Sequence, residues 1–117
     1  MISAFQSALS GLQAFGLKLH SNANNIANSS TEQFKRTRVL LGADQSLGVQ
    51  AQVEKVLTPG AEIYTQTSTG EELIELSNVD LADQLIELNL SKTLYKANLK
   101  TIQVTDDMFG SLLKLKA

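Results

Sequence analysis

The last forty residues constrain the fold most, because they have the pattern of one long helix with two apolar sides. The pair Ser77 and Asp80, three residues apart, is a capping signal that predicts the helix start. At about 100° per residue, the first stripe consists of Leu81, Leu85, Leu88, Tyr95, Leu99, Ile102, Phe109 and Leu113. The second stripe lies opposite and consists of Leu90, Leu94, Ala97, Val104, Met108, Leu112 and Leu115. A helix that is apolar on two sides is expected to be buried on two sides.

The first part of the chain, up to about Asn28, carries a single apolar stripe. Its steps alternate between three and four residues, which is the heptad spacing of a coiled coil, and its members are Ile2, Phe5, Leu9, Leu12, Gly16, Leu19, Ala23 and Ile26. Asparagines between Asn22 and Asn28 lower the helix propensity, so this helix should end there. We predict that the two terminal helices pair, through a seam of Ile2, Phe5, Leu9, Leu12, Leu19, Ile26, Leu85, Leu88, Tyr95, Leu99, Ile102 and Phe109.

The second stripe of the C-terminal helix then has no partner within the chain. Fully burying one such side chain contributes about 1.5–3 kcal/mol, so a row of them is a strong association surface. A contact between unlike surfaces that does not close on itself produces a filament. Periodicity therefore predicts a subunit of a helical or tubular assembly, with the second stripe as the inter-subunit face. Two alternatives remain open: the helix is kinked, or the middle segment covers the second stripe.

The middle segment contains the only proline and most of the glycines. Val49, Ala51 and Val53 alternate with polar residues, as in a half-buried strand. Thr58-Pro59-Gly60 suits a type II turn, in which Gly60 would supply the positive φ. The sequence predicts a mainly α fold with a small β segment: long N- and C-terminal helices in a coiled-coil pair, and a short β-hairpin region between them. The segments are 1–38, 39–76 and 77–117.

Composition excludes several functions. No cysteine is present, and the net charge of −2 gives no electrostatic surface for nucleic acid. His20 is the only histidine, and the adjacent Asp106 and Asp107 point to different sides of a helix. We therefore expect no catalytic residue, no metal ligand and no cofactor, and we expect that the chain is not an enzyme unless copies share a site. No apolar run is long enough to span a bilayer.

Two further features have competing explanations. Gly11 and Gly16 either weaken the first helix or permit close approach of another helix. Lys92, Lys96 and Lys100 repeat every four residues, which mildly destabilises an isolated helix. This row is either a solvated edge or a surface that faces an acidic neighbour in an assembly.

Two motifs resemble the terminal signatures of flagellar rod, hook and hook-associated proteins. The first consists of Asn24, Asn25, Ile26, Ala27 and Asn28, followed by Thr31, Phe34, Lys35 and Arg36. The second consists of Ser77, Asn78, Val79, Asp80 and Leu81, then Glu87 and Leu88, then Tyr95, Lys96, Ala97 and Asn98. Gln33 stands where the family usually has glycine, which predicts a different turn shape. The motifs appear in the family's order, each on its expected helix.

This resemblance implies a structural subunit of the bacterial flagellar basal-body rod, with its terminal helices polymerised into the axial tube. The short middle segment resembles that of the short proximal rod subunits, the C-type more than the B-type. The implied partners are other copies of the chain, other rod proteins and the flagellar type III export apparatus. The implied location is the periplasmic rod, reached without a cleaved signal peptide. The alternative is a helical-hairpin adaptor or export chaperone that binds one partner through its second stripe.

Overall fold

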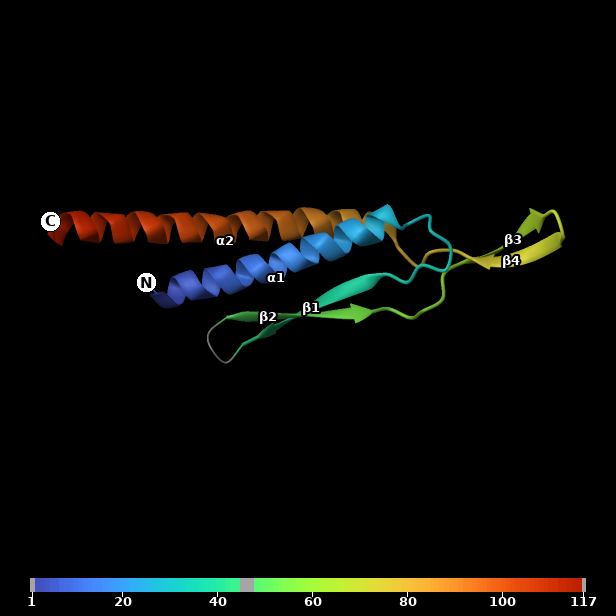
Figure 1. Cartoon of the computed structure of the whole chain (residues 1–117), viewed down its shortest axis with the longest axis horizontal. Helices are drawn as coiled ribbons and strands as arrows, with labels where there is room; N and C mark the ends of the chain where they lie inside the picture. Colours follow the sequence, from blue (N-terminus) through green and yellow to red (C-terminus); the bar gives the residue numbers. More distant parts are fainter. Residues whose placement is uncertain (1, 45–47, 117) are drawn as a thin grey trace.

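The computed structural model describes residues 2–44 and 48–116 and shows an elongated molecule of 80 × 24 × 19 Å (Figure 1). In chain order the elements are helix α1 (Ile2–Ala27), strands β1 (Thr37–Ala43), β2 (Val49–Lys55), β3 (Glu62–Thr67) and β4 (Gly70–Glu75), and helix α2 (Leu81–Lys116). The predicted fold class is confirmed: two long terminal helices enclose a small β region. That region contains two antiparallel hairpins, β1–β2 and β3–β4, where the sequence predicted one.

Helix α1 is the middle layer of the molecule. It packs against α2 on one side and against the β1–β2 hairpin on the other, whereas β3–β4 projects past the start of α2 (Figure 1). Within the described ranges, α2 packs on α1 and on no strand. Figure 1 also shows α2 as one straight helix. Neither a kink nor the middle segment therefore accounts for the second apolar stripe.

Asp80 caps α2. Its Oδ1 accepts hydrogen bonds from the backbone N–H groups of Ala82 at 2.9 Å and Asp83 at 3.2 Å, which satisfies donors that have no partner inside the helix. The Ser77 hydroxyl accepts a bond from the Val79 N–H at 3.3 Å and lies before the helix. The capping signal thus marked the right place, but the capping residue is Asp80.

The predicted type II turn at Gly60 is wrong. Among the described glycines, the one with a positive φ is Gly70, at 135°. Gly60 is needed for close packing instead, since a Cβ there would lie 2.0 Å from the carbonyl oxygen of Leu76. Gln33, by contrast, has a φ of 57°, so the turn keeps the left-handed backbone that glycine favours.

Very little apolar side chain is buried. The buried hydrophobic residues of the described structure are Ala8, Ala14 and Val39. The accessible surface is 8276 Å², against about 6,200 Å² for a compact monomer of this mass. The excess, about 2,000 Å², is comparable to a standard protein–protein interface. The single chain therefore leaves an interface-sized area in water.

Candidate functional site

Asn25 joins three elements where the helices meet. It is fully buried, and its Nδ2 donates to the Thr37 carbonyl at 2.7 Å and to Gln84 Oε1 at 2.9 Å. Its Oδ1 accepts the Thr37 N–H at 2.9 Å, and the Thr37 hydroxyl pairs with Ser21 at 2.7 Å. Because Asn25 bonds β1 and α2 at once, this residue of the first family motif fixes the position of both relative to α1.

Asn78, in the second family motif, also joins several elements through its side-chain amide. Its Oδ1 accepts the Arg36 N–H at 2.7 Å, and its Nδ2 donates to the carbonyls of Val56 and Thr58, both at 2.8 Å. One amide side chain thus connects the entry to β1, the exit from β2 and the entry to α2. We call the region organised by Asn25 and Asn78 the junction.

A charged bridge completes the junction. Lys35 Nζ pairs with Glu75 Oε1, which also accepts the backbone N–H of Gly60 at 2.7 Å. The hydrogen bond from Lys35, with help from that of Gly60, holds the pKa of Glu75 below its ordinary value, against the opposing effect of partial desolvation. The side chains are 17 % and 27 % exposed, respectively. The bridge connects the segment after α1 to the base of β3–β4.

The remaining motif residues close the helix ends or lie along the helix pair. Asn28 Nδ2 donates to the Asn24 carbonyl at 2.9 Å, and Asn28 Oδ1 accepts the Thr31 hydroxyl at 3.1 Å, just after Ala27 ends α1. Asn98 Nδ2 donates to the Leu94 carbonyl at 2.9 Å. Its side chain lies against Gly11, where a Cβ would be 2.7 Å from Asn98 Oδ1. Gly11 therefore permits close approach of the two helices.

The α2 side of the helix contact is a heptad line of alternating polar and apolar residues. Its least exposed positions, at steps of three and four, are Gln84, Leu88, Ser91, Tyr95, Asn98, Ile102, Thr105 and Phe109. Gln84, Ser91 and Thr105 are 6 %, 1 % and 5 % exposed. Sequence reasoning missed these polar members because it searched for apolar periodicity. Their own signal is a polar residue every seven positions from Gln84.

The α1 side of the contact is displaced by one residue from the predicted stripe. Asn25 bonds Gln84, Lys18 pairs with Glu87 at 2.6 Å, and Gly11 faces Asn98. These residues and those between them at steps of three and four form one line on α1: Ala8, Gly11, Phe15, Lys18, Asn22 and Asn25. Each residue of this line comes one position before a residue of the predicted stripe. One residue is about 100° around a helix. The apolar stripe of α1 therefore lies at the edge of the contact, where a Cβ on Gly16 would still be 3.6 Å from the Tyr95 ring.

The predicted seam residues are accordingly divided. On α2, Leu88, Tyr95, Ile102 and Phe109 lie on the contact line, whereas Leu85 and Leu99 are 47 % and 40 % exposed. On α1, Leu12, Leu19 and Ile26 are half-buried, and the exposed members are Ile2 at 68 %, Phe5 at 37 % and Leu9 at 38 %. The structure thus brings the half-buried members towards the helix pair and leaves five of the twelve exposed.

The second stripe of α2 is exposed along its whole length in the single chain. The exposed members are Leu90, Leu94, Ala97, Val104, Met108, Leu112 and Leu115. Because the antiparallel pairing sets Gly11 beside Asn98, the last turns of α2 extend past the start of α1 (Figure 1). Met108 and Leu112, 50 % and 48 % exposed, therefore lie on a helix end that no other described element covers.

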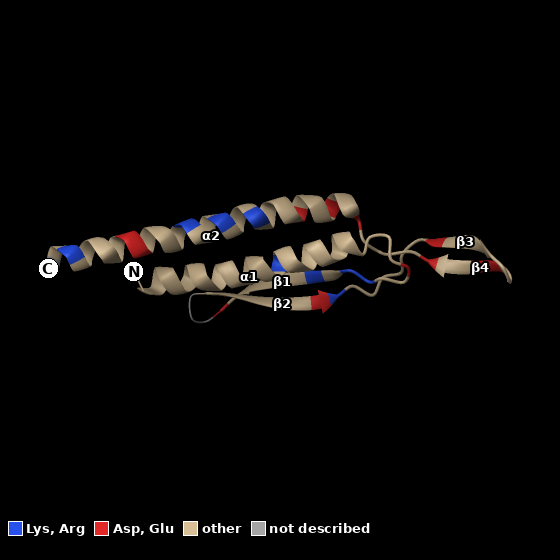
Figure 2. Cartoon of the chain, turned by 45° about the horizontal axis from the view of Figure 1, so that its top comes forward, with Lys and Arg blue, Asp and Glu red and all other residues tan. Residues whose placement is uncertain are grey.

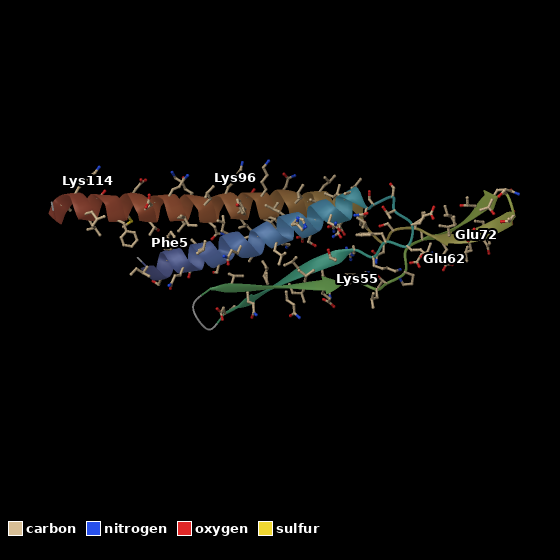
Figure 3. All side chains as sticks on the ribbon, in the orientation of Figure 1. Phe5, Lys55, Glu62, Glu72, Lys96 and Lys114 are labelled. Carbon is tan, nitrogen blue, oxygen red and sulfur yellow. The ribbon has the colours of Figure 1, made fainter. Side chains whose placement is uncertain are left out.

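Charge is distributed unevenly along the molecule. Acidic residues gather on β3–β4 and at the start of α2, and lysines follow along α2 (Figure 2). The sequence has no Lys or Arg between Lys55 and Lys92 but seven Asp and Glu residues in that interval. Lys96 and Lys114 project from the side of α2 that faces away from α1 (Figure 3).

Residues 2–44 and 48–116 contain neither a group of potential metal ligands nor a membrane-spanning helix. No three acidic or histidine side chains in these ranges are grouped so that they could hold a metal ion. Neither α1 nor α2 combines the length and the apolarity required to cross a membrane. The geometry defines an elongated helix-pair protein whose candidate site is a set of surfaces and not a cavity.

Residues 71–115 match the family model described as flagellar basal body rod FlgEFG protein C-terminal. The match runs from β4 through most of α2 and includes Asn78, Asp80, Tyr95 and Asn98. The match confirms the resemblance to the flagellar rod and hook family over this segment. It also supports a structural role of the flagellar rod type. A comparison with curated proteins gives no match.

Proposed function

We propose that the chain is a structural subunit of the flagellar basal-body rod that polymerises through its two terminal helices. The observation that supports this most is the outward placement of apolar residues on both helices. On α1, Ile2, Phe5 and Leu9 are exposed, and on α2, Leu94, Val104 and Met108 are 36 %, 44 % and 50 % exposed. Neighbouring subunits would bury both surfaces, and at about 25 cal/mol per Å² the excess area is ample to drive assembly.

The proposal includes a position and a route. The short segment between the helices favours a proximal rod subunit of the C-type, in contact with other copies of the chain and with other rod proteins. Export through the flagellar type III apparatus and a periplasmic location follow from the same family resemblance. Gene neighbourhood and a cryo-electron map of purified basal bodies would test these parts.

Polymerisation is tested on the purified chain. Concentrated protein should form tubes or filaments in electron micrographs and scatter light accordingly, and Leu94→Asp or Val104→Asp should abolish assembly. Asn89→Asp is the matched control, because it adds the same charge to an exposed position outside the stripe. A monodisperse dimer at all concentrations would favour the adaptor or chaperone alternative. Normal assembly of the Leu94→Asp variant would contradict the role of the stripe.

A further inference from the structure

We infer that the β3–β4 hairpin of one copy docks on the lysine row of α2 in a second copy. We define the lysine row as Lys92, Lys96 and Lys100. The inference rests on the proposed function, since it supplies an additional contact between polymerised subunits. It differs from that proposal because the contact is charged and does not use the second stripe.

The hairpin presents one face suited to a basic partner. In its antiparallel register, Glu62, Tyr64 and Gln66 lie opposite Glu75, Leu73 and Glu71, so these six side chains share a face. Tyr64 and Leu73, at its centre, are 76 % and 49 % exposed. Glu62 and Glu71 mark the two ends, four residues apart along the strand, which is about 13 Å. Glu75 is already paired with Lys35, so the free charges are those at Glu62 and Glu71.

The lysine row has the complementary pattern. All three lysines are exposed, and in the part of the chain that the structure describes none of them forms a salt bridge. From Lys92 to Lys100 the helix rises about 12 Å, close to the separation of the two glutamates. Leu99, 40 % exposed, lies beside the row. The hairpin therefore has apolar residues between its charges and the helix has one beside them, and the charges are opposite in sign.

The contact has to form between copies. The hairpin projects beyond the start of α2 and away from the lysine row, so the two surfaces of one chain do not meet (Figures 1 and 3). The interval from 56 to 91 has no basic residue, and the salt bridge from Lys35 neutralises Glu75 but not Glu62 or Glu71. A contact between these two unlike surfaces is heterologous and propagates along the long axis. The glutamates of a second copy would also offset the repulsion between like charges at four-residue spacing on one helix.

Disulfide cross-linking tests the contact directly, since the chain has no cysteine. Tyr64→Cys and Lys96→Cys proteins are mixed and oxidised, and the mixed disulfide dimer is measured. The control pairs Tyr64→Cys with Lys114→Cys, a lysine on the same helix about 27 Å away. We expect about tenfold more mixed dimer with Lys96→Cys, because only that pair would approach to disulfide distance. Equal yields in both mixtures would overturn the inference.

Charge reversal provides the second arm. Glu62→Lys with Glu71→Lys should raise the critical concentration for assembly about tenfold at low salt, and Lys92→Glu, Lys96→Glu and Lys100→Glu together should do the same. An equimolar mixture of the two reversed proteins should restore assembly, and salt at about 0.5 M should reduce the differences. Undiminished assembly of both reversed proteins would contradict the docking.

The two proposals can fail separately. If wild-type protein forms no tubes but the Lys96→Cys cross-link is favoured, the polymer proposal fails and the docking contact stands.

Discussion

Asn25 and Ser91 are the largest side chains that the described structure buries almost completely, and both are polar. At the junction, both amide atoms of Asn25 have hydrogen-bond partners. In the middle of the helix contact, Ser91 Oγ has none among the described residues, and the same is true of Asn22 Nδ2. A buried polar group without a partner costs about 1–3 kcal/mol. The junction is thus fixed by satisfied polar contacts at Asn25, whereas the buried hydroxyl of Ser91 makes the helix contact less stable than it could be.

This difference shows that polar contacts set the geometry of the chain, whereas much of its apolar surface is left for contacts with neighbours. The junction sets the geometry of the helices, hairpins and connecting segments without an apolar core. Part of the apolar surface of both helices lies outside their contact, including the whole second stripe of α2. A chain arranged in this way has little to gain from folding alone and much to gain from neighbours that bury its stripes.

The largest effect is expected from removing the central amide of the junction. Asn25→Ala should lower the free energy of unfolding by about 3 kcal/mol, because it removes the hydrogen-bond partner of the Thr37 N–H and of Gln84 Oε1 and one of the two partners of the Thr37 carbonyl. Urea unfolding followed by circular dichroism measures this. Asn24→Ala, at the exposed neighbouring position, should change it by less than about 0.5 kcal/mol. Equal losses in the two variants would show that the junction is not fixed by Asn25.

A steric change at the junction should come next. Gly60→Ala places a methyl group against the Leu76 carbonyl and should cost about 2 kcal/mol, measured by the same urea titration. Gly42→Ala is the control, since a Cβ there would meet nothing within 4 Å. Equal stability of wild-type protein and Gly60→Ala would mean that this close approach is not required.

A change in the helix contact should have the opposite sign. Ser91→Ala removes a buried hydroxyl that has no partner and adds a better helix former, so it should stabilise the chain by about 1 kcal/mol. Thermal unfolding by circular dichroism would detect the shift. Ser111→Ala, where the exposed hydroxyl donates to the Asp107 carbonyl at 2.9 Å, should show only the helix-propensity part of this gain, about 0.5 kcal/mol or less. If Ser91→Ala destabilises the chain, the hydroxyl contributes to the contact and the contrast with Asn25 fails.

The smallest effect concerns the charged bridge. Because folding lowers the pKa of Glu75, the bridge contributes stability above the pH at which a free glutamate titrates, about 4. This contribution is lost as the pH falls through the lowered pKa. The stability difference between wild-type protein and Glu75→Gln should therefore shrink on acidification, as measured by urea midpoints at neutral and acidic pH. In a Lys35→Met background, Glu75→Gln should show much less pH dependence.

Much of the fold follows from local chemistry that the sequence displays. The asparagines before Asn28 and the capping signal at Asp80 mark the end of α1 and the start of α2 to within a few residues. The strand at Val49 is also correct, since β2 begins there. Leu73 and Ile74, just after Gly70, also indicate a short strand, and β4 contains both residues. The sequence nevertheless predicted one hairpin region where the structure has two.

The helix contact shows why the site residues were harder to predict. A search for apolar periodicity assumes that the apolar side of a helix faces its partner within the chain. On α1 the centre of the observed contact lies one residue before the predicted seam. Gly11 and Asn25 occupy it because they permit closer and more specific contacts than leucines would. Gln33 shows the same limit for turns: its residue type argues against a left-handed backbone, but the hydrogen bond from its N–H to the Glu75 carbonyl at 2.9 Å stabilises that conformation.

The unequal lengths of the two helices have a mechanical consequence. Because α2 extends past the start of α1, the helices of one molecule do not end in a common plane. In a stack of molecules along the axis, the protruding end of α2 in one molecule would lie beside the helices of the next molecule. A twisting load on such a stack would act as shear along the overlapping helix faces, spread over many side chains, and no single cross-section would carry all the strain.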